Sequence, residues 1–176
     1  MKILGFAGWS GSGKTTVIEQ ILPILRDEGL SVALIKHAHH EFDIDQPGKD
    51  SWRHRKAGCR EVLVTSAVRW ALMHELQDEP ELTLHAALRQ LTPCDLVLVE
   101  GFKRAEIPKI EIHRQSVGKP LLYPDDPHII GLATDDRPAH ADASIPVLDL
   151  NNARTIAVFA IQHCAELSID NPGVGL

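Results

Sequence analysis

The pattern of apolar and polar positions divides the chain into short runs typical of buried strands and longer segments with a helical period. Apolar residues recurring every three or four positions predict helices over residues 15–26, 82–91 and 152–167, and a capping residue predicts another over 50–57. The expected buried strands are Ile3–Ala7, Ser31–His37, Asp95–Gly101, Lys109–His113, His128–Thr134 and Pro146–Leu150. Strands that alternate with helices predict an α/β fold with a mostly parallel sheet.

The stretch "EVLVTSAVRWALMHE" interrupts this alternation with two strand-like runs, residues 62–65 and 70–74. A few residues separate the runs, which predicts an antiparallel hairpin. Because this hairpin is so apolar, exposing one of its faces or its strand edge to water is costly. We therefore expect a homodimer with Trp70 or Leu72 near its interface; the alternative is a hairpin that packs wholly within its own domain.

Length and charge narrow the class of protein. The 176 residues fit a single domain over 1–168, followed by a frayed tail over 169–176. A formal net charge of −6 argues against nucleic acid as a partner, because that role needs a basic face. The three cysteines are widely spaced and form no CxxC, which favours reduced thiols in the cytosol. No run is long and apolar enough for a membrane span.

A phosphate-binding loop follows the first predicted strand. Residues Gly8 to Thr15 fit the pattern G-x-x-x-x-G-K-[ST] and open a predicted helix, so backbone N–H groups can converge on phosphate oxygens. Lys14 is expected to reach the outer phosphates, and the Thr15 hydroxyl to bind Mg²⁺. The predicted nucleotide-binding residues of this loop are Gly8, Trp9, Ser10, Gly11, Ser12, Gly13, Lys14, Thr15 and Thr16. The context predicts a P-loop NTPase fold of three layers.

Three further residues are candidates for the same site. Glu100 ends the buried run "LVLVE", at the edge of the sheet where open α/β folds place ligands, and could hold a Mg²⁺-bound or attacking water. Asp50 begins a predicted helix and is either a second Mg²⁺-water ligand or a simple N-cap. Lys36, at the end of the second strand, is either a phosphate-neutralising cation or a surface lysine. Lys14, Asp50 and Glu100 are the predicted catalytic residues.

The stretch "KHAHHEFDIDQPGKDS" gathers His37, His39 and His40 with Asp43 and Asp45. Such a set could bind a transition metal, could contact an anionic second ligand and move with the nucleotide state, or could be a plain polar loop. Spacing alone leaves the three interpretations open.

These motifs together resemble the MobB family, P-loop GTP-binding proteins of molybdenum-cofactor maturation. The matching pieces cover most of residues 3–114 and are "GWSGSGKTT", "LIKHAHHEFDIDQPGKDS", "RKAGCREVLVTSAVRWALMHE", "DLVLVEGFK" and "PKIEIHR". The phosphate loop is generic, whereas "KHAHH…PGKDS" and "RWAL" are specific. After residue 114 the similarity thins to "HIIGLATDD" and "LDLNN".

The resemblance implies GTP and Mg²⁺, a homodimer, and assistance to the guanylyltransferase that attaches GMP to molybdopterin. A similarity to the wider branch with dethiobiotin synthetase and nickel-insertion GTPases supports Asp50 and Glu100 as ligands of metal-bound water. Together with Thr15 of the phosphate loop they are the predicted metal-site residues. The extra lysine of some dimeric ATPases in that branch is absent, because Trp9 follows Gly8. Asp135 in "ATDD" could accept from the two donors of guanine, although the usual Asn-Lys before it is missing.

The leading hypothesis is a slowly hydrolysing GTP-binding adaptor that supplies guanine nucleotide, or molybdopterin, to the guanylyltransferase. Slow turnover follows because the sequence offers no obvious arginine finger. The second hypothesis is a metallochaperone GTPase that carries a metal on His37 to His40, and the third is a nucleotide-gated binding module without hydrolysis.

Overall fold

A computed structural model describes residues 1–38, 41–136 and 145–167 of the chain. Met1–His37 and the residues from Thr83 onward form one compact unit, and Ala38–Leu82 form a second. The single domain over 1–168 stays a prediction, and the tail over 169–176 lies outside the described residues.

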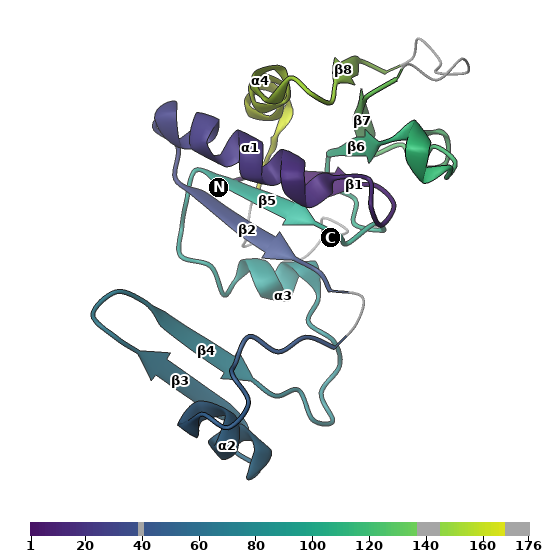
Figure 1. The fold of residues 1–176 in the computed structure, drawn as a ribbon. Helices are drawn as coiled ribbons and strands as arrows, with labels where there is room; N and C mark the ends of the chain where they lie inside the picture. Colours follow the sequence, from purple (N-terminus) through teal and green to yellow (C-terminus); the bar gives the residue numbers. More distant parts are fainter. Residues whose placement is uncertain (39–40, 137–144, 168–176) are drawn as a thin grey trace. The chain divides into compact units, whose positions relative to one another are not determined.

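The first unit is built on a mostly parallel sheet (Figure 1), which confirms the predicted fold class. The strands run in the order β2-β5-β1-β6-β7-β8, each parallel to its neighbours, and β9 pairs antiparallel with the start of β1. Their bounds are β1 Lys2–Ala7, β2 Val32–Lys36, β5 Leu96–Glu100, β6 Lys109–His113, β7 Ile129–Thr134, β8 Val147–Asp149 and β9 Ala165–Glu166. All carboxyl ends of the parallel strands therefore meet at one edge of the sheet.

Helices cover both faces of this sheet (Figure 1). On one face α1, Lys14–Asp27, and α4, Ala153–His163, pack against the even-numbered residues of β1 and β6. On the other face the short α3, Leu84–Leu88, packs with Ile3, Val97 and Val99. Two 3₁₀ turns, Gln115–Val117 and Tyr123–Asp125, lie between β6 and β7. Within the described ranges, no helix has the length and apolar character that a bilayer crossing requires.

Three elements of the first unit differ from the predictions. The second strand is not fully buried, because β2 is an edge strand with one neighbour, and Leu34 is exposed. Thr83 caps α3 by accepting from the Ala86 N–H, and the helix is shorter than the predicted 82–91. The last helix ends at His163, because Cys164 is extended and the following residues pair with β1 as β9.

The second unit holds α2, Asp50–Lys56, and the predicted antiparallel hairpin of β3, Glu61–Thr65, and β4, Trp70–His74. Asp50 is the first helical residue and Lys49 is the N-cap, so the N-cap role considered for Asp50 is wrong. The guanidinium of Arg55 binds carboxylates of Asp43, Asp45 and Glu75, at 2.7, 3.3 and 2.6 Å. Its three ion pairs tie the loop before α2 to the end of β4.

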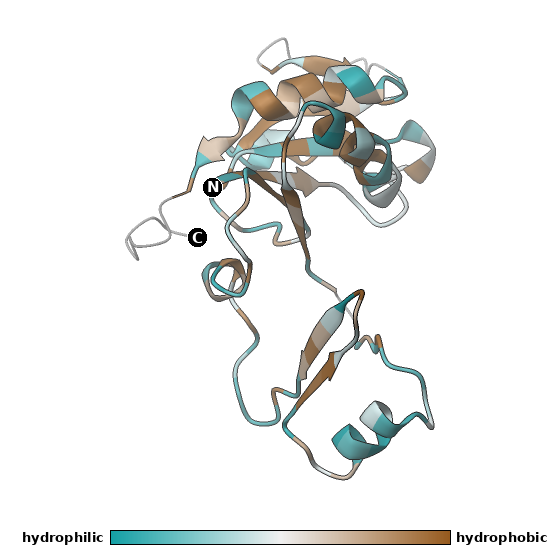
Figure 2. Ribbon diagram, turned by 90° about the vertical axis from the view of Figure 1, so that its left-hand side faces the viewer, coloured by the Kyte–Doolittle hydropathy of each residue, from teal (hydrophilic) through white to brown (hydrophobic). Residues whose placement is uncertain are grey.

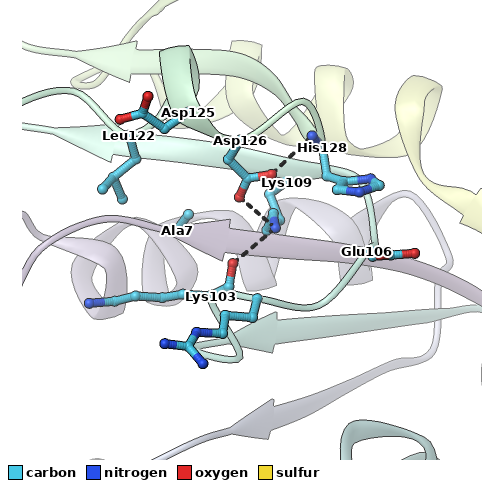
Figure 3. A pocket seen from close by; sticks show the side chains of 9 residues that line it. Ala7, Lys103, Glu106, Lys109, Leu122, Asp125, Asp126 and His128 are labelled. Carbon is cyan, nitrogen blue, oxygen red and sulfur yellow. Dashed lines mark hydrogen bonds and ion pairs between the residues drawn. The ribbon is translucent and has the colours of Figure 1, made fainter. Parts of the chain in front are cut away.

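One buried ion pair stabilises the loops around β6. Lys109, which is 1% exposed, places its ammonium group 2.7 Å from Asp126 Oδ2 and donates to the carbonyl oxygen of Lys103 (Figure 3). The same group also donates to the carbonyl oxygen of Ala105. Asp126 also accepts the N–H of His128. All three ammonium donors thus have acceptors, and they hold the segments before and after β6 together beside a cavity of about 400 Å³.

We predict that Lys109→Met lowers the free energy of unfolding by about 3–5 kcal/mol, because it removes the ammonium group from Asp126 Oδ2 and from two carbonyl oxygens. Urea denaturation of both forms measures the difference. The matched control is Lys2→Met, which removes an exposed ion pair with Glu166 and should cost less than about 1 kcal/mol. Equal losses in the two variants would show that the buried pair has no special weight.

Candidate nucleotide-binding site

The predicted phosphate loop connects the carboxyl end of β1 to the first turn of α1 (Figure 1). Gly8 has φ 145°, and a Cβ at this position would lie 2.4 Å from the Ile112 carbonyl oxygen and 2.7 Å from Ser12 Oγ. A side chain at Gly8 would therefore force the loop away from β6. The loop reaches the helix N-terminus close against the sheet, where backbone N–H groups and the helix dipole favour an anion.

The Lys14 side chain folds back over this loop. Its ammonium group donates to the carbonyl oxygens of Gly8 and Trp9, at 2.9 and 3.0 Å. Burial lowers the pKa of Lys14; the Glu100 carboxylate opposes this effect, and the ammonium groups of Lys103 and Lys36 add to it. Lys14 is thus repelled by two other ammonium groups, and a polyanion would offset that repulsion.

Thr15, Glu100 and Lys36 meet beside Lys14. The Thr15 hydroxyl donates to Glu100 Oε1 at 3.1 Å, and Lys36 Nζ lies 3.3 Å from Glu100 Oε2. The parallel register places Lys36 and Phe6 on either side of Glu100, so the sheet itself brings the three strand ends together. A hydroxyl and a buried carboxylate in contact are the oxygen donors that Mg²⁺ prefers, so these residues fit the expected ion.

Ser12 is the most buried polar residue of the loop. Its hydroxyl oxygen has no hydrogen-bond partner in the part of the chain that the structure describes. An unsatisfied buried hydroxyl is costly unless a ligand or water pairs with it. Its place within a phosphate-binding loop fits an oxygen-rich ligand.

Trp9 connects the phosphate loop to two other segments. The sequence did not predict these contacts. Its indole N–H donates to the Pro120 carbonyl oxygen at 2.8 Å, and the ammonium groups of Lys103 and Lys119 lie 5.0 and 5.8 Å from its ring centre. Both distances are within the range of a cation–π interaction. The loops after β5 and β6 therefore contact the phosphate loop through one aromatic ring. Lys103 could have been identified from its place in the stretch "EGFK", three residues after Glu100.

Asp135 directly follows β7, and its carboxylate is occupied. Oδ2 lies 3.1 Å from Arg114 Nη1, and Oδ1 accepts the Gln115 N–H at 3.4 Å. A guanine base read by Asp135 would have to compete with these contacts, and that role stays a prediction. Arg114 was not singled out from the sequence, although it directly follows the predicted strand Lys109–His113. Position at the end of a strand was the criterion that identified Glu100.

Asp50 and the histidine loop belong largely to the second unit. Asp50 is exposed at the start of α2, 3.9 Å from Arg53, and its role as a Mg²⁺-water ligand stays a prediction. The His37 ring packs against the ring of Phe102, and the His37 backbone N–H donates to the Glu100 carbonyl oxygen. His39 and His40 lie outside the described residues. Within residues 1–38, 41–136 and 145–167, no three His, Cys, Asp or Glu side chains form a metal-binding cluster.

The chain is similar in sequence and in fold to known proteins of molybdopterin-guanine dinucleotide biosynthesis. The chain is 44% identical over 163 residues to the molybdopterin-guanine dinucleotide biosynthesis adapter protein of Escherichia coli strain K12, covering 91% of each chain. It is 43% identical over 157 residues to the adapter protein of the same description from Haemophilus influenzae, covering 89% of this chain and 86% of the relative. A crystal structure of molybdopterin-guanine biosynthesis protein B superposes with a TM-score of 0.68 at 28% identity, over 91% of this chain and 98% of the other.

Residues 3–135 also match the family model described as "Molybdopterin guanine dinucleotide synthesis protein B". This match spans the phosphate loop, the second unit, Glu100 and Asp135. The chain therefore belongs to the MobB family.

Proposed function

We propose that this protein binds GTP with Mg²⁺ at residues 8–16, hydrolyses it slowly, and acts as a cytosolic adaptor for the guanylyltransferase that converts molybdopterin to its guanine dinucleotide. The observation that carries the nucleotide site is the meeting of Lys14, Thr15 and Glu100 at the end of β1. The adaptor role is supported by the descriptions of the relatives at 43–44% identity.

Lys14 is the residue that recognises the outer phosphates in this proposal. Its ammonium group already points into the loop, where it binds two carbonyl oxygens. Charged phosphate oxygens are stronger acceptors than these carbonyl oxygens, so a bound phosphate would compete with them for the ammonium group. Lys36 and Lys103 add positive charge to the same region, and Asp50 is proposed as a further ligand of Mg²⁺-bound water.

Glu100 orients water and holds the metal site together with Thr15. The Mg²⁺ ion, when bound, would neutralise charge that develops on the phosphates. The carboxylate is buried at a strand end and its two oxygens contact Thr15 and Lys36. Slow turnover is proposed because the sequence offers no obvious arginine finger, so a partner would supply what is missing.

The preference for guanine and the delivery to the guanylyltransferase rest on family membership. The adaptor either presents GTP or holds molybdopterin while the partner joins the two. Free thiols at Cys59, Cys94 and Cys164 suit a reducing compartment.

The hairpin of the second unit supports a homodimer. Residue pairs Leu63 with Leu72 and Thr65 with Trp70 place three large apolar side chains on one face of β3–β4. That face is exposed: Leu63 by 60%, Trp70 by 65% and Leu72 by 45%. Figure 2 shows that both strands are largely hydrophobic, whereas α2 is hydrophilic. A two-stranded hairpin is marginally stable alone, and a second copy of the same face would cover it symmetrically.

Lys14→Ala is predicted to abolish tight GTP binding, since it removes the cation that faces the outer phosphates. Titration with labelled GTP measures the affinity. The adaptor role is measured separately, by pull-down of the guanylyltransferase in the presence of GTP, GDP or ATP. Lys2→Ala, which removes an exposed lysine at the start of β1, is the control. A folded Lys14→Ala protein with unchanged affinity would refute the assignment of the phosphate loop.

Glu100→Gln should keep GTP binding while it slows hydrolysis by about tenfold or more, because it preserves the shape but removes the charge that orients water. Single-turnover phosphate release with Mg²⁺ measures the rate. Glu166→Gln changes an exposed glutamate in the same way and should leave the rate unchanged. Full turnover in Glu100→Gln would move the catalytic role to another residue.

A charged residue in the apolar face should dissociate the dimer. We expect the unmodified chain to sediment as a dimer at micromolar concentration and Trp70→Asp or Leu72→Asp to sediment as monomers. The control Val158→Glu places a charge at an exposed apolar position of α4, where no interface is proposed. A monomeric unmodified chain would contradict the proposal.

A further inference from the structure

Arg114 leaves β6 at the edge of the sheet that holds the phosphate loop. Its strand ends at His113, which is paired with Thr134, the last residue of β7. Arg114 and Asp135 are therefore the next residues of two neighbouring parallel strands and emerge at the same level. The register thus explains why their side chains meet 3.1 Å apart.

The guanidinium of Arg114 lies directly against Gly13, the residue before α1. A Cβ on Gly13 would be 3.2 Å from Nε and 3.5 Å from Nη2 of Arg114. Gly13 also has φ 95°, so both its conformation and the arginine favour glycine here. The guanidinium thus occupies space beside the helix N-terminus, where a bound phosphate is expected.

Asp135 leaves part of the guanidinium available. Nη1 donates to Asp135, whereas Nε and Nη2 face the phosphate loop and have no acceptor in the part of the chain that is described. Arginine presents its donors in a fixed fork, so binding one side to Asp135 fixes the direction of the others. A partly exposed ion pair contributes little stability by itself, and its main effect here is to orient Arg114.

We propose that Arg114 is a nucleotide-binding residue that donates to a phosphate of the bound nucleotide, and that Asp135 positions it. The inference rests on the proposed binding of a nucleotide at residues 8–16. It gives Asp135 a role through Arg114, in place of direct contact with guanine. The interaction does not require the guanine base. The affinity for inorganic triphosphate, which has no nucleoside, should therefore also depend on Arg114.

The test compares GTP with inorganic triphosphate, both with Mg²⁺, by calorimetric titration. Arg114→Ala should weaken both ligands by a similar factor, about tenfold to a hundredfold, which is the range of a charge-assisted hydrogen bond. Arg114→Lys, which keeps the charge but not the fork, should fall between. Arg154→Ala, which removes an arginine from an exposed ion pair on α4, is the matched control and should bind as the unmodified protein does.

The positioning role needs a second measurement. Asp135→Asn should weaken both ligands by about threefold to tenfold in the unmodified background and have no further effect in Arg114→Ala, because coupled residues are not additive. A merely structural aspartate would lower the melting temperature of both backgrounds without this dependence.

Each other outcome overturns a distinct statement. If Arg114→Ala weakens GTP alone, the arginine contacts the base; if it weakens neither ligand, it contacts no part of the nucleotide. If Asp135→Asn acts equally in both backgrounds and changes the choice between guanine and xanthine nucleotides, Asp135 reads the base itself. If the unmodified protein binds neither ligand, the proposed function fails before the inference does.

Discussion

The register of β1 with its two parallel neighbours, β5 and β6, is the constraint on which the candidate site depends. Phe6 lies opposite Glu100 on one side, and Ala7 lies opposite Glu111 on the other. The phosphate loop begins at the next residue, so the register decides which side chains surround it. The Thr15–Glu100 hydrogen bond joins residues 85 positions apart, and no local preference could form it. A shift of one residue would turn Glu100 to the other face of the sheet.

The distribution of charge at this site opposes that of the whole chain. The protein has a formal net charge of −6, yet Lys36 and Lys103 both repel the ammonium group of Lys14 at the phosphate loop. Burial and these neighbours lower the pKa of Lys14, so its charged form is less favourable than in water. A bound polyanion would reverse the effect of the neighbours. The repulsion among the lysines is therefore part of what a triphosphate would relieve on binding.

Much of this architecture was predictable because it is encoded locally. The buried runs, the phosphate loop and the strand-end position of Glu100 follow from periodicity and from the geometry of parallel sheets. The end of α4 was not predictable, because the apolar spacing continues through residues that pair with β1 instead. Contacts such as Trp9 with Lys103 and Asp135 with Arg114 join separate loops, and spacing along the chain carries no signal for them.

The position of the second unit in the sequence affects how the fold can tolerate insertions. Residues 38–82 fall between β2 and α3, within the crossover that leads to β5. The closure entropy of a connection rises slowly, by about 0.6 kcal/mol for each doubling of its length. A module can therefore be inserted, shortened or exchanged in this crossover while the sheet keeps its strand order. The turn between β1 and α1 has less freedom, because a side chain at Gly8 would meet the backbone of β6.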